Sequence, residues 1–206
     1  MMYAPQGSGA WLNQRVGRLT ASRMAAAMDF LKNGKPSADR TNLMRELLAE
    51  RLTGDAVPHP VTPPMLWGIE QEPHAKSEYE ALTGNLLTPC GFIEHPTIEF
   101  FGGSPDALLD DDAVFEAKCP NTTTHVAWIL AGEVPAQHKP QILAQLACTR
   151  RTRAVFVSFD PRIPGAKRIF VREWEPKPEE IEAVETAAVA FLAELDALFE
   201  QLTEAV

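Results

Sequence analysis

The chain has little cysteine and no long apolar run in its 206 residues. Its three cysteines, Cys90, Cys119 and Cys148, are odd in number and far apart. That spacing excludes a disulfide framework and the zinc and iron–sulfur motifs that need closely spaced cysteines. No apolar segment approaches the roughly 18 residues that cross a bilayer, and the N-terminus lacks the basic-then-apolar layout of a signal peptide. We therefore expect a cytoplasmic protein with no membrane partner.

Positive charge is scarce as well, since 19 Lys and Arg against 28 Asp and Glu give a net charge of −9. This argues against a nucleic-acid partner until the distribution is considered. From Glu175 onward there are nine acidic residues against one lysine, so eight of the nine net charges lie there. The remainder carries three basic clusters, which are Arg15, Arg18 and Arg23; Lys32, Lys35 and Arg40; and Arg150, Arg151 and Arg153. Basic patches that bind a polyanion can therefore coexist with an acidic protein.

The length, and a hydrophobic content of 45% without internal repeats, indicate one globular domain over residues 1–206. We expect a helical N-terminal part at about 8–83, a catalytic sheet core at about 86–174 and an acidic C-terminal helix at about 178–205. The fold class is α/β, with a mixed central β-sheet flanked by helices.

Hydrophobic periodicity and helix-capping residues predict the individual elements. Helices are expected at about 8–14, 20–30, 38–52, 65–83, 123–131 and 139–150. Strands are expected at about 86–93, 100–109, 113–118, 154–160 and 168–174, and the first three of these would form a meander. Thr20 and Ser22 offer hydroxyl caps for the second helix. The last helix has an apolar stripe from Ile181 to Leu202, which needs a partner surface in its own domain or in a neighbouring subunit.

One segment has the residue types of a metal-dependent hydrolase. The acidic turn 110–112 would fold strand 113–118 back onto the run after Asp106, and so bring Asp106, Glu116 and Lys118 together. Glu116 and Lys118 point the same way because side chains alternate along a strand. Carboxylate and carbonyl oxygens suit Mg²⁺, and a nearby lysine can orient or deprotonate an attacking water, or stabilise a pentavalent phosphate. The alternative is an ordinary surface hairpin, although unpaired charges on a central strand are costly unless they face a polar cleft.

Five motifs, two of which contain the residues just described, stand in a characteristic order: RVGRLTAS at 15–22, WGIEQE at 67–72, SPDAL at 104–108, EAKCP at 116–120 and FDPR at 159–162. Together they resemble the lambda-type (YqaJ-like) alkaline exonucleases, phage recombination nucleases of the restriction-endonuclease-like superfamily. The resemblance extends from about Trp11 to Trp174, and the acidic C-terminal helix has no matching motif. It implies a restriction-endonuclease-like core and a Mg²⁺-dependent nuclease in which Mn²⁺ can substitute.

The resemblance also implies roles for individual residues. Asp106, Glu116 and the backbone carbonyl of Ala117 match metal ligands, and Lys118 matches the catalytic lysine. Glu72 matches a further carboxylate that reaches in from a helix; Glu70 competes for this role, but residues i and i+2 do not share a helix face. Gln141 matches a water-positioning glutamine, and Gln145 lies one turn later on the same face. For both glutamines the alternative is an ordinary polar helix face.

A second group of residues matches the site that binds the DNA end. Arg15 and Ser22, with Thr20 beside them, match the pocket for the 5′-phosphate, and an arginine fork with hydroxyls suits an anion. Met65 or Leu66 stands where the family places an apolar wedge that unpairs terminal bases. Without the resemblance, the hydroxyls would be caps, Arg15 a surface charge and Met65 part of a buried helix start. His125 and His138 belong to no zinc spacing and are interpreted as structural.

The implied activity is 5′→3′ digestion of one strand of double-stranded DNA from its ends, which leaves 3′ overhangs for recombination by strand annealing. The resemblance further implies a homotrimeric ring and a single-strand annealing protein as partner. Two alternatives stay open. One is a structure-specific or single-strand nuclease on the same core, and the other is a catalytically inert DNA-binding recombination protein.

Overall fold

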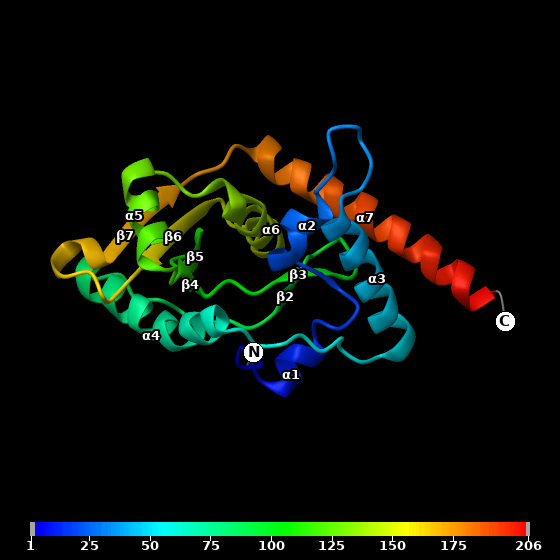
Figure 1. Cartoon of the computed structure of the whole chain (residues 1–206), viewed down its shortest axis with the longest axis horizontal. Coiled ribbons are helices and arrows are strands. Elements are labelled where there is room, and N and C mark those ends of the chain that lie inside the picture. The colour runs from blue at the N-terminus through cyan, green and yellow to red at the C-terminus, as the bar shows by residue number, and fades with distance from the viewer. Residues whose placement is uncertain (1–2, 205–206) are drawn as a thin grey trace.

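The structure, a computed structural model, describes residues 3–204 and contains two β-sheets (Figure 1). A three-stranded sheet has the order β1-β3-β2, and a four-stranded sheet has the order β4-β5-β6-β7. The strands are β1 (Leu19–Thr20), β2 (Ile93–Glu94), β3 (Phe101–Gly103), β4 (Ala107–Leu109), β5 (Ala113–Lys118), β6 (Arg153–Phe159) and β7 (Ile169–Trp174).

The four-stranded sheet is mixed and has helices on both faces. Strands β5 and β6 are parallel, and they are connected through α5 (Thr122–Ala131), the 3₁₀ turn η2 (Ala136–His138) and α6 (Lys139–Thr149). On one face α4 (Pro63–Thr83) packs Ala75 and Tyr79 against the side chains around Phe115. On the other face α6 packs Ile142 and Leu146 against Phe156 and its neighbours. The predicted α/β class with a mixed, helix-flanked sheet is therefore confirmed.

The remaining helices surround the small sheet. They are α1 (Gly9–Asn13), the 3₁₀ turn η1 (Ala21–Arg23), α2 (Met24–Ala27), α3 (Ala38–Thr53) and α7 (Pro178–Glu204). Helix α3 forms because the Ser37 hydroxyl caps its first turn and Gly54, with φ +76°, ends it. The apolar stripe of α7 packs against α2, α3 and α6 as far as Leu195. Its partner surface therefore lies mainly in the same chain, although Leu198 and Leu202 stay exposed.

The predicted strand at 100–109 is wrong as a single element. It divides into β3 and β4, which belong to different sheets, because Pro105 has no N–H to continue a ladder. The predicted strand at 86–93 is reduced to a bridge from Thr88 to Leu108 and the two residues of β2, with Pro89 between them. The predicted meander is therefore broken between two sheets: β2 pairs antiparallel with β3 in one sheet, and β4 pairs antiparallel with β5 in the other. The predicted hairpin of β4 and β5 is confirmed.

The predicted helix at 20–30 is also shorter than expected. It is reduced to η1 and the four residues of α2, and neither Thr20 nor Ser22 caps it. The Ala27 carbonyl instead accepts a hydrogen bond from Arg40 Nε at 3.0 Å. The following residues turn back, so that Phe30 bridges to Pro36. A long-range contact thus replaces the next helical turn.

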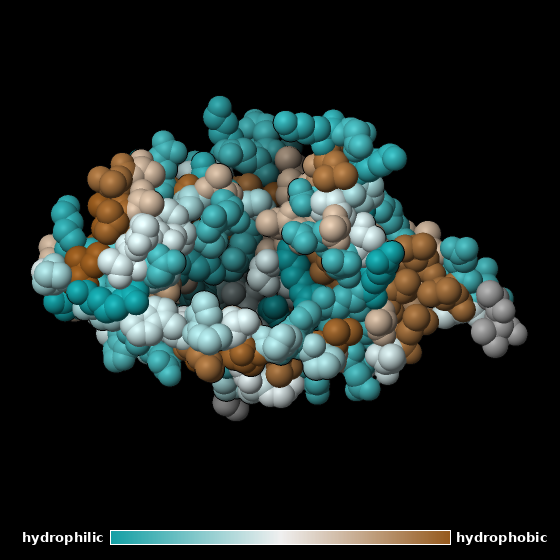
Figure 2. Space-filling model, in the orientation of Figure 1, coloured by the Kyte–Doolittle hydropathy of each residue, from teal (hydrophilic) through white to brown (hydrophobic). Residues whose placement is uncertain are grey.

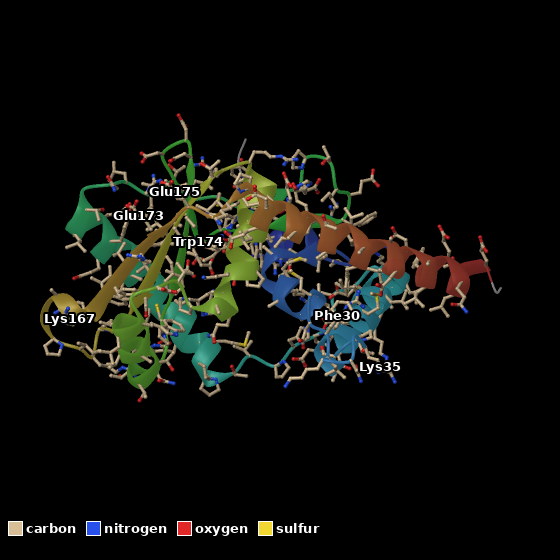
Figure 3. All side chains as sticks on the ribbon, turned by 90° about the horizontal axis from the view of Figure 1, so that it is seen from above. Phe30, Lys35, Lys167, Glu173, Trp174 and Glu175 are labelled. Carbon is tan, nitrogen blue, oxygen red and sulfur yellow. The ribbon has the colours of Figure 1, made fainter. Side chains whose placement is uncertain are left out.

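The molecule is elongated, and the two ends of its long axis are visible in Figure 3. Lys167, in the 3₁₀ turn η3 (Gly165–Arg168) between β6 and β7, lies at one end, whereas the loop of Phe30 and Lys35 lies toward the other. Within residues 3–204, no helix is long and apolar enough to cross a bilayer.

Candidate active site

The hairpin of β4 and β5 brings the three predicted residues together. Ala107 pairs with Phe115 and Leu109 pairs with Ala113, which sets the register of the hairpin. The Asp106 carboxylate, just before β4, accepts a hydrogen bond at 2.7 Å from the backbone N–H of Ala117. The Lys118 ammonium pairs with the Glu116 carboxylate. Because β5 lies inside the sheet, this charged group is built into the core, not onto a solvated hairpin.

Two glutamines of α6 hold Glu116 from the opposite side. Gln141 Nε2 donates to Oε1 of Glu116 at 2.6 Å, and Gln145 Nε2 donates to Oε2 at 2.7 Å. Both reach the same carboxylate because they lie one helical turn apart. Gln145 is fully buried, and its Oε1 has no hydrogen-bond partner among the described residues. The two side chains are therefore not an ordinary polar helix face, because they fix the orientation of Glu116.

The site has an excess of buried negative charge. Burial raises the pKa of Asp106 well above its usual range, and the charges of Glu116 and Glu72 raise it further. Burial alone would lower the pKa of Lys118, but the neighbouring Glu116 and Asp106 outweigh it and raise that pKa. In this arrangement Lys118 carries a proton, and the carboxylates of Asp106, Glu116 and Glu72 outnumber the lysines beside them, which favours an additional cation.

Glu72 contributes a third carboxylate from α4. It lies close enough to raise the pKa of Asp106, and it accepts a hydrogen bond from Lys76 at 2.6 Å. Glu70, its competitor in the sequence, is exposed.

The donor set fits a hard divalent cation, because such cations take carboxylate oxygens as ligands. A bound cation would also offset the repulsion among these carboxylates. Among residues 3–204, no three His, Cys, Asp or Glu side chains converge as a preformed metal cage. Lys118, Lys76 and the Ala117 N–H each occupy an oxygen of one of the three carboxylates. Ala117 donates its backbone N–H to Asp106, and its carbonyl is a predicted ligand.

A second predicted group forms a pocket of about 270 Å³, and Arg15, Thr20 and Met65 all line it. Arg15 Nη2 lies 3.4 Å from each of the hydroxyls of Thr20 and Ser22. Burial and the charge of Arg23 lower the pKa of Arg15 to about 10, so its guanidinium stays protonated at neutral pH. A half-buried cation beside two hydroxyls is a suitable anion site. Leu66, the other wedge candidate, is half exposed and is not among the lining residues.

Two further residues line this pocket, Arg23, which the sequence placed in a basic cluster with Arg15, and Trp11, which sequence reasoning did not single out. The Trp11 ring lies under the Arg15 guanidinium at 4.2 Å, and its indole N–H donates to the Ser104 hydroxyl at 2.9 Å. Arg23 pairs with Glu46 at 2.5 Å, while its Nη1 is buried with no partner within the described part of the chain. Trp11 stands four residues before Arg15, and this spacing was the sequence signal for their contact. Through Ser104 the pocket reaches the loop that carries Asp106.

Of the other basic and titratable residues, some lie away from these two groups and some border them. Lys32 and Lys35 lie in an exposed loop, while Arg18 lines the pocket. His125 is buried and bonds Ser158 and the Lys167 carbonyl, which agrees with a structural role. His138 stacks on Phe156, and burial, followed by the charge of Lys118, lowers its pKa to about 4.

Figure 2 shows that the face bearing α4 is hollowed at its centre, between α4 and the elements α2 and α6. A mixed sheet with carboxylates and a lysine on a central hairpin defines a class of protein, the restriction-endonuclease-like nucleases. Residues 10–152 match the YqaJ-like viral recombinase domain, and the chain belongs to that family.

Solved structures agree with this assignment. The chain is 40% identical to the alkaline exonuclease LHK-Exo from Laribacter hongkongensis, with 96% of this chain and 97% of that chain covered and a TM-score of 0.89. A second structure of LHK-Exo, in complex with dAMP, matches with the same values. A phage-related exonuclease from Haemophilus somnus 129PT, at 16% identity, a TM-score of 0.70 and 92% and 98% coverage, shares the fold. No curated protein matches the sequence. The family and the LHK-Exo structures support the role of a DNA exonuclease for this chain.

Proposed function

We propose that the protein is a Mg²⁺-dependent 5′→3′ exonuclease that digests one strand of double-stranded DNA from its ends and leaves 3′ single-stranded overhangs. The observation that carries this proposal is the hairpin group of Asp106, Glu116 and Lys118, with Glu116 held by two glutamines. The LHK-Exo structure that contains dAMP supports a mononucleotide as the product. It does not bear on polarity.

Asp106, Glu116 and Glu72, with the Ala117 carbonyl, would hold Mg²⁺, or Mn²⁺ in its place. When bound, the cation supplies Lewis acidity at the phosphodiester and a more acidic water. Gln141 and Gln145 orient Glu116, and Lys118 places a positive charge beside the reacting phosphate. A lysine whose pKa is raised is better suited to orient water and stabilise negative charge than to remove a proton.

Polarity would come from Arg15 and Thr20, which line the pocket, and from the adjacent Ser22 hydroxyl; together they would bind the 5′-phosphate of the end. The Trp11–Ser104 hydrogen bond links this pocket to the Asp106 loop, so a bound end would lie at a set distance from the scissile bond. Met65 lines the same pocket and would unpair the terminal bases. Its half-exposed side chain supports a contact with DNA.

The family supports three further parts of the proposal. Residues 1–206 would form one nuclease domain, three copies would form a ring around DNA, and a single-strand annealing protein would receive the 3′ overhang. The acidic C-terminal helix would lie outside the DNA path of such a ring. Three free cysteines fit a cytoplasmic location.

Digestion of linear duplexes with 5′-phosphate or 5′-hydroxyl ends tests the proposal. Protein, the Lys118→Ala variant and an exposed-lysine control, Lys167→Ala, are each incubated with and without Mg²⁺. We expect Mg²⁺-dependent release of mononucleotides from phosphorylated ends, loss in Lys118→Ala and full activity in Lys167→Ala. Digestion that ignores the metal or survives Lys118→Ala would overturn the mechanism. Equal rates on both ends would overturn the role of Arg15 and Ser22, and faster digestion of single strands would favour the alternative nuclease.

A further inference from the structure

Helix α4, which carries Glu72, consists of two halves with different anchorage. Pro73 stands inside the helix. A proline has no N–H for the carbonyl four residues earlier, so the hydrogen bonding of the helix is interrupted there. The half after Pro73 is anchored in the core by Ala75 and by Tyr79, whose ring lies 5.0 Å from that of Phe115.

The half before Pro73 has no buried residue. Its apolar side chains Met65, Leu66 and Ile69 are 49%, 51% and 65% exposed. Glu72 is the last residue of this half. Its position relative to Asp106 and Lys118 therefore depends on contacts outside the hydrophobic core.

Lys76 of the second half pairs with Glu72 itself, and the contact to the first half from outside the helix comes from the FDPR motif. The Arg162 guanidinium lies over the Trp67 ring at 4.7 Å, a cation–π geometry. The indole N–H of Trp67 is buried and has no hydrogen-bond partner in the described part of the chain. Stacking on Arg162 is thus the specific interaction that fixes this ring.

Arg162 is itself held rigidly by Asp160, a buried carboxylate. Asp160 accepts from Nε and Nη2 of Arg162 at 2.7 and 3.1 Å, from the Arg162 backbone N–H at 3.0 Å and from the Thr122 hydroxyl at 2.6 Å. Such a two-pronged arginine–carboxylate pair fixes the plane of the guanidinium.

The same pair also contacts the end of the catalytic strand. Arg162 Nη2 donates to the Pro120 carbonyl at 3.2 Å, and Pro120 stands two residues after Lys118. Thr122, which bonds Asp160, begins α5. Asp160 and Arg162 therefore join two segments, the one that ends in Lys118 and the one that ends in Glu72.

We propose that Asp160 and Arg162 are positioning residues that, through Trp67, hold Glu72 in register with Lys118 and Asp106. This inference rests on the role proposed above for Glu72. Neither residue touches the reacting atoms. Their effect is geometric, and a displacement of about 1 Å in a catalytic group costs on the order of a hundredfold in rate.

Substitutions at Trp67 test this without leaving Asp160 unpaired. Trp67→Leu removes the aromatic face, Trp67→Phe keeps one, and Arg172→Ala, an exposed arginine on β7, is the control. We expect Trp67→Leu to lower kcat about ten- to a hundredfold, Trp67→Phe to restore most of it, and Arg172→Ala to be neutral. The preference for 5′-phosphate ends should persist in all three, because it depends on Arg15.

A double-mutant cycle with Glu72→Gln separates positioning from general destabilisation. If Trp67 acts through Glu72, Trp67→Leu lowers kcat in the parent but has little further effect in Glu72→Gln. Arg162→Lys, a second variant that keeps the charge but loses the planar fork, should behave in the same way. Urea denaturation of each variant gives the folded fraction by which kcat is corrected.

The two levels of failure can be told apart. If Glu72→Gln keeps full kcat, the proposed role of Glu72 fails and this inference fails with it. If Glu72→Gln is slow but Trp67→Leu is as fast as the parent, or is equally slowed in both backgrounds, only the positioning role is overturned. A Trp67→Phe variant as slow as Trp67→Leu would also overturn it.

Discussion

The two glutamines that hold Glu116 differ in their access to water. Gln145 is fully buried, whereas Gln141 is partly exposed. Each donates one hydrogen bond to a different oxygen of the same buried carboxylate, at 2.7 and 2.6 Å. Replacing each in turn by alanine removes a similar bond to Glu116 in unequal surroundings, and Gln145→Ala also removes a 3.4 Å bond to the Ser104 carbonyl.

The expected costs follow from what replaces the lost bond. A hydrogen bond to a charged group contributes about 1.5–3 kcal/mol, and a buried carboxylate cannot recover it from solvent. In Gln145→Ala the lost packing adds to this cost, and removal of the unpartnered Oε1 offsets part of it, so we expect about 2–3 kcal/mol. In Gln141→Ala a water can take the vacated place, so we expect about 0–1 kcal/mol. For a chain of this size, each kcal/mol corresponds to about 2–4 °C in Tm.

Urea denaturation in EDTA measures both free energies of unfolding, and the exonuclease assay with Mg²⁺ measures both activities. We expect Gln145→Ala to be the less stable variant by about 1–3 kcal/mol, while both variants lose kcat because each frees Glu116 to rotate. Equal losses of stability, or a larger loss in Gln141→Ala, would refute the argument from burial. Full activity in both would refute the orienting role.

Two further outcomes follow from other parts of the molecule. Gly17 has φ +66°, and an alanine Cβ there would lie 2.7 Å from Arg51 Cγ, so Gly17→Ala should lower the free energy of unfolding by more than about 1–2 kcal/mol and raise KM for 5′-phosphorylated ends. Gly34→Ala, at φ +78° in open space, is the matched control. Equal losses of unfolding free energy in urea would contradict the clash. Burial would raise the pKa of Asp160, but hydrogen bonds from Arg162 and Thr122 lower it from 3.8 to about 2. The stability that Asp160 contributes is therefore present above pH 3.8 and lost as the pH falls toward 2. In Asp160→Asn the unfolding free energy should decline less steeply between these pH values. A decline as steep as that of the parent would contradict this role of Asp160.

Local rules predict much of this fold from the sequence. Alternation along β5 correctly placed Glu116 and Lys118 on one side, and the acidic turn correctly predicted the hairpin. The division of 100–109 was missed because its apolar content suits a strand throughout, while Pro105 directs its two ends into different sheets. The ending of α2 depends on Arg40, a residue 13 positions from the carbonyl that it binds, and local propensity carries no such information.

The same limit applies to the site. Spacing alone placed Gln141 and Gln145 on one helix face, but that both bond Glu116 depends on how α6 packs on the sheet. The Asp160–Arg162 pair could be noted as part of a motif, whereas its contact with Trp67 joins residues 95 positions apart. Contacts of this kind are fixed by tertiary packing.

The acidic helix α7 has a consequence for how DNA first meets the protein. Figure 1 places α7 along one edge of the molecule, and α4 and α1 near the opposite edge. A polyanion that diffuses toward α7 is repelled, whereas one that approaches Arg15, Arg18 and Arg23 is attracted. The charge asymmetry thus biases the orientation in which DNA meets the protein, so that fewer collisions occur at the acidic face of α7. Because salt screens charges that are more than about a Debye length apart, this bias should act on the association rate and be strongest at low ionic strength.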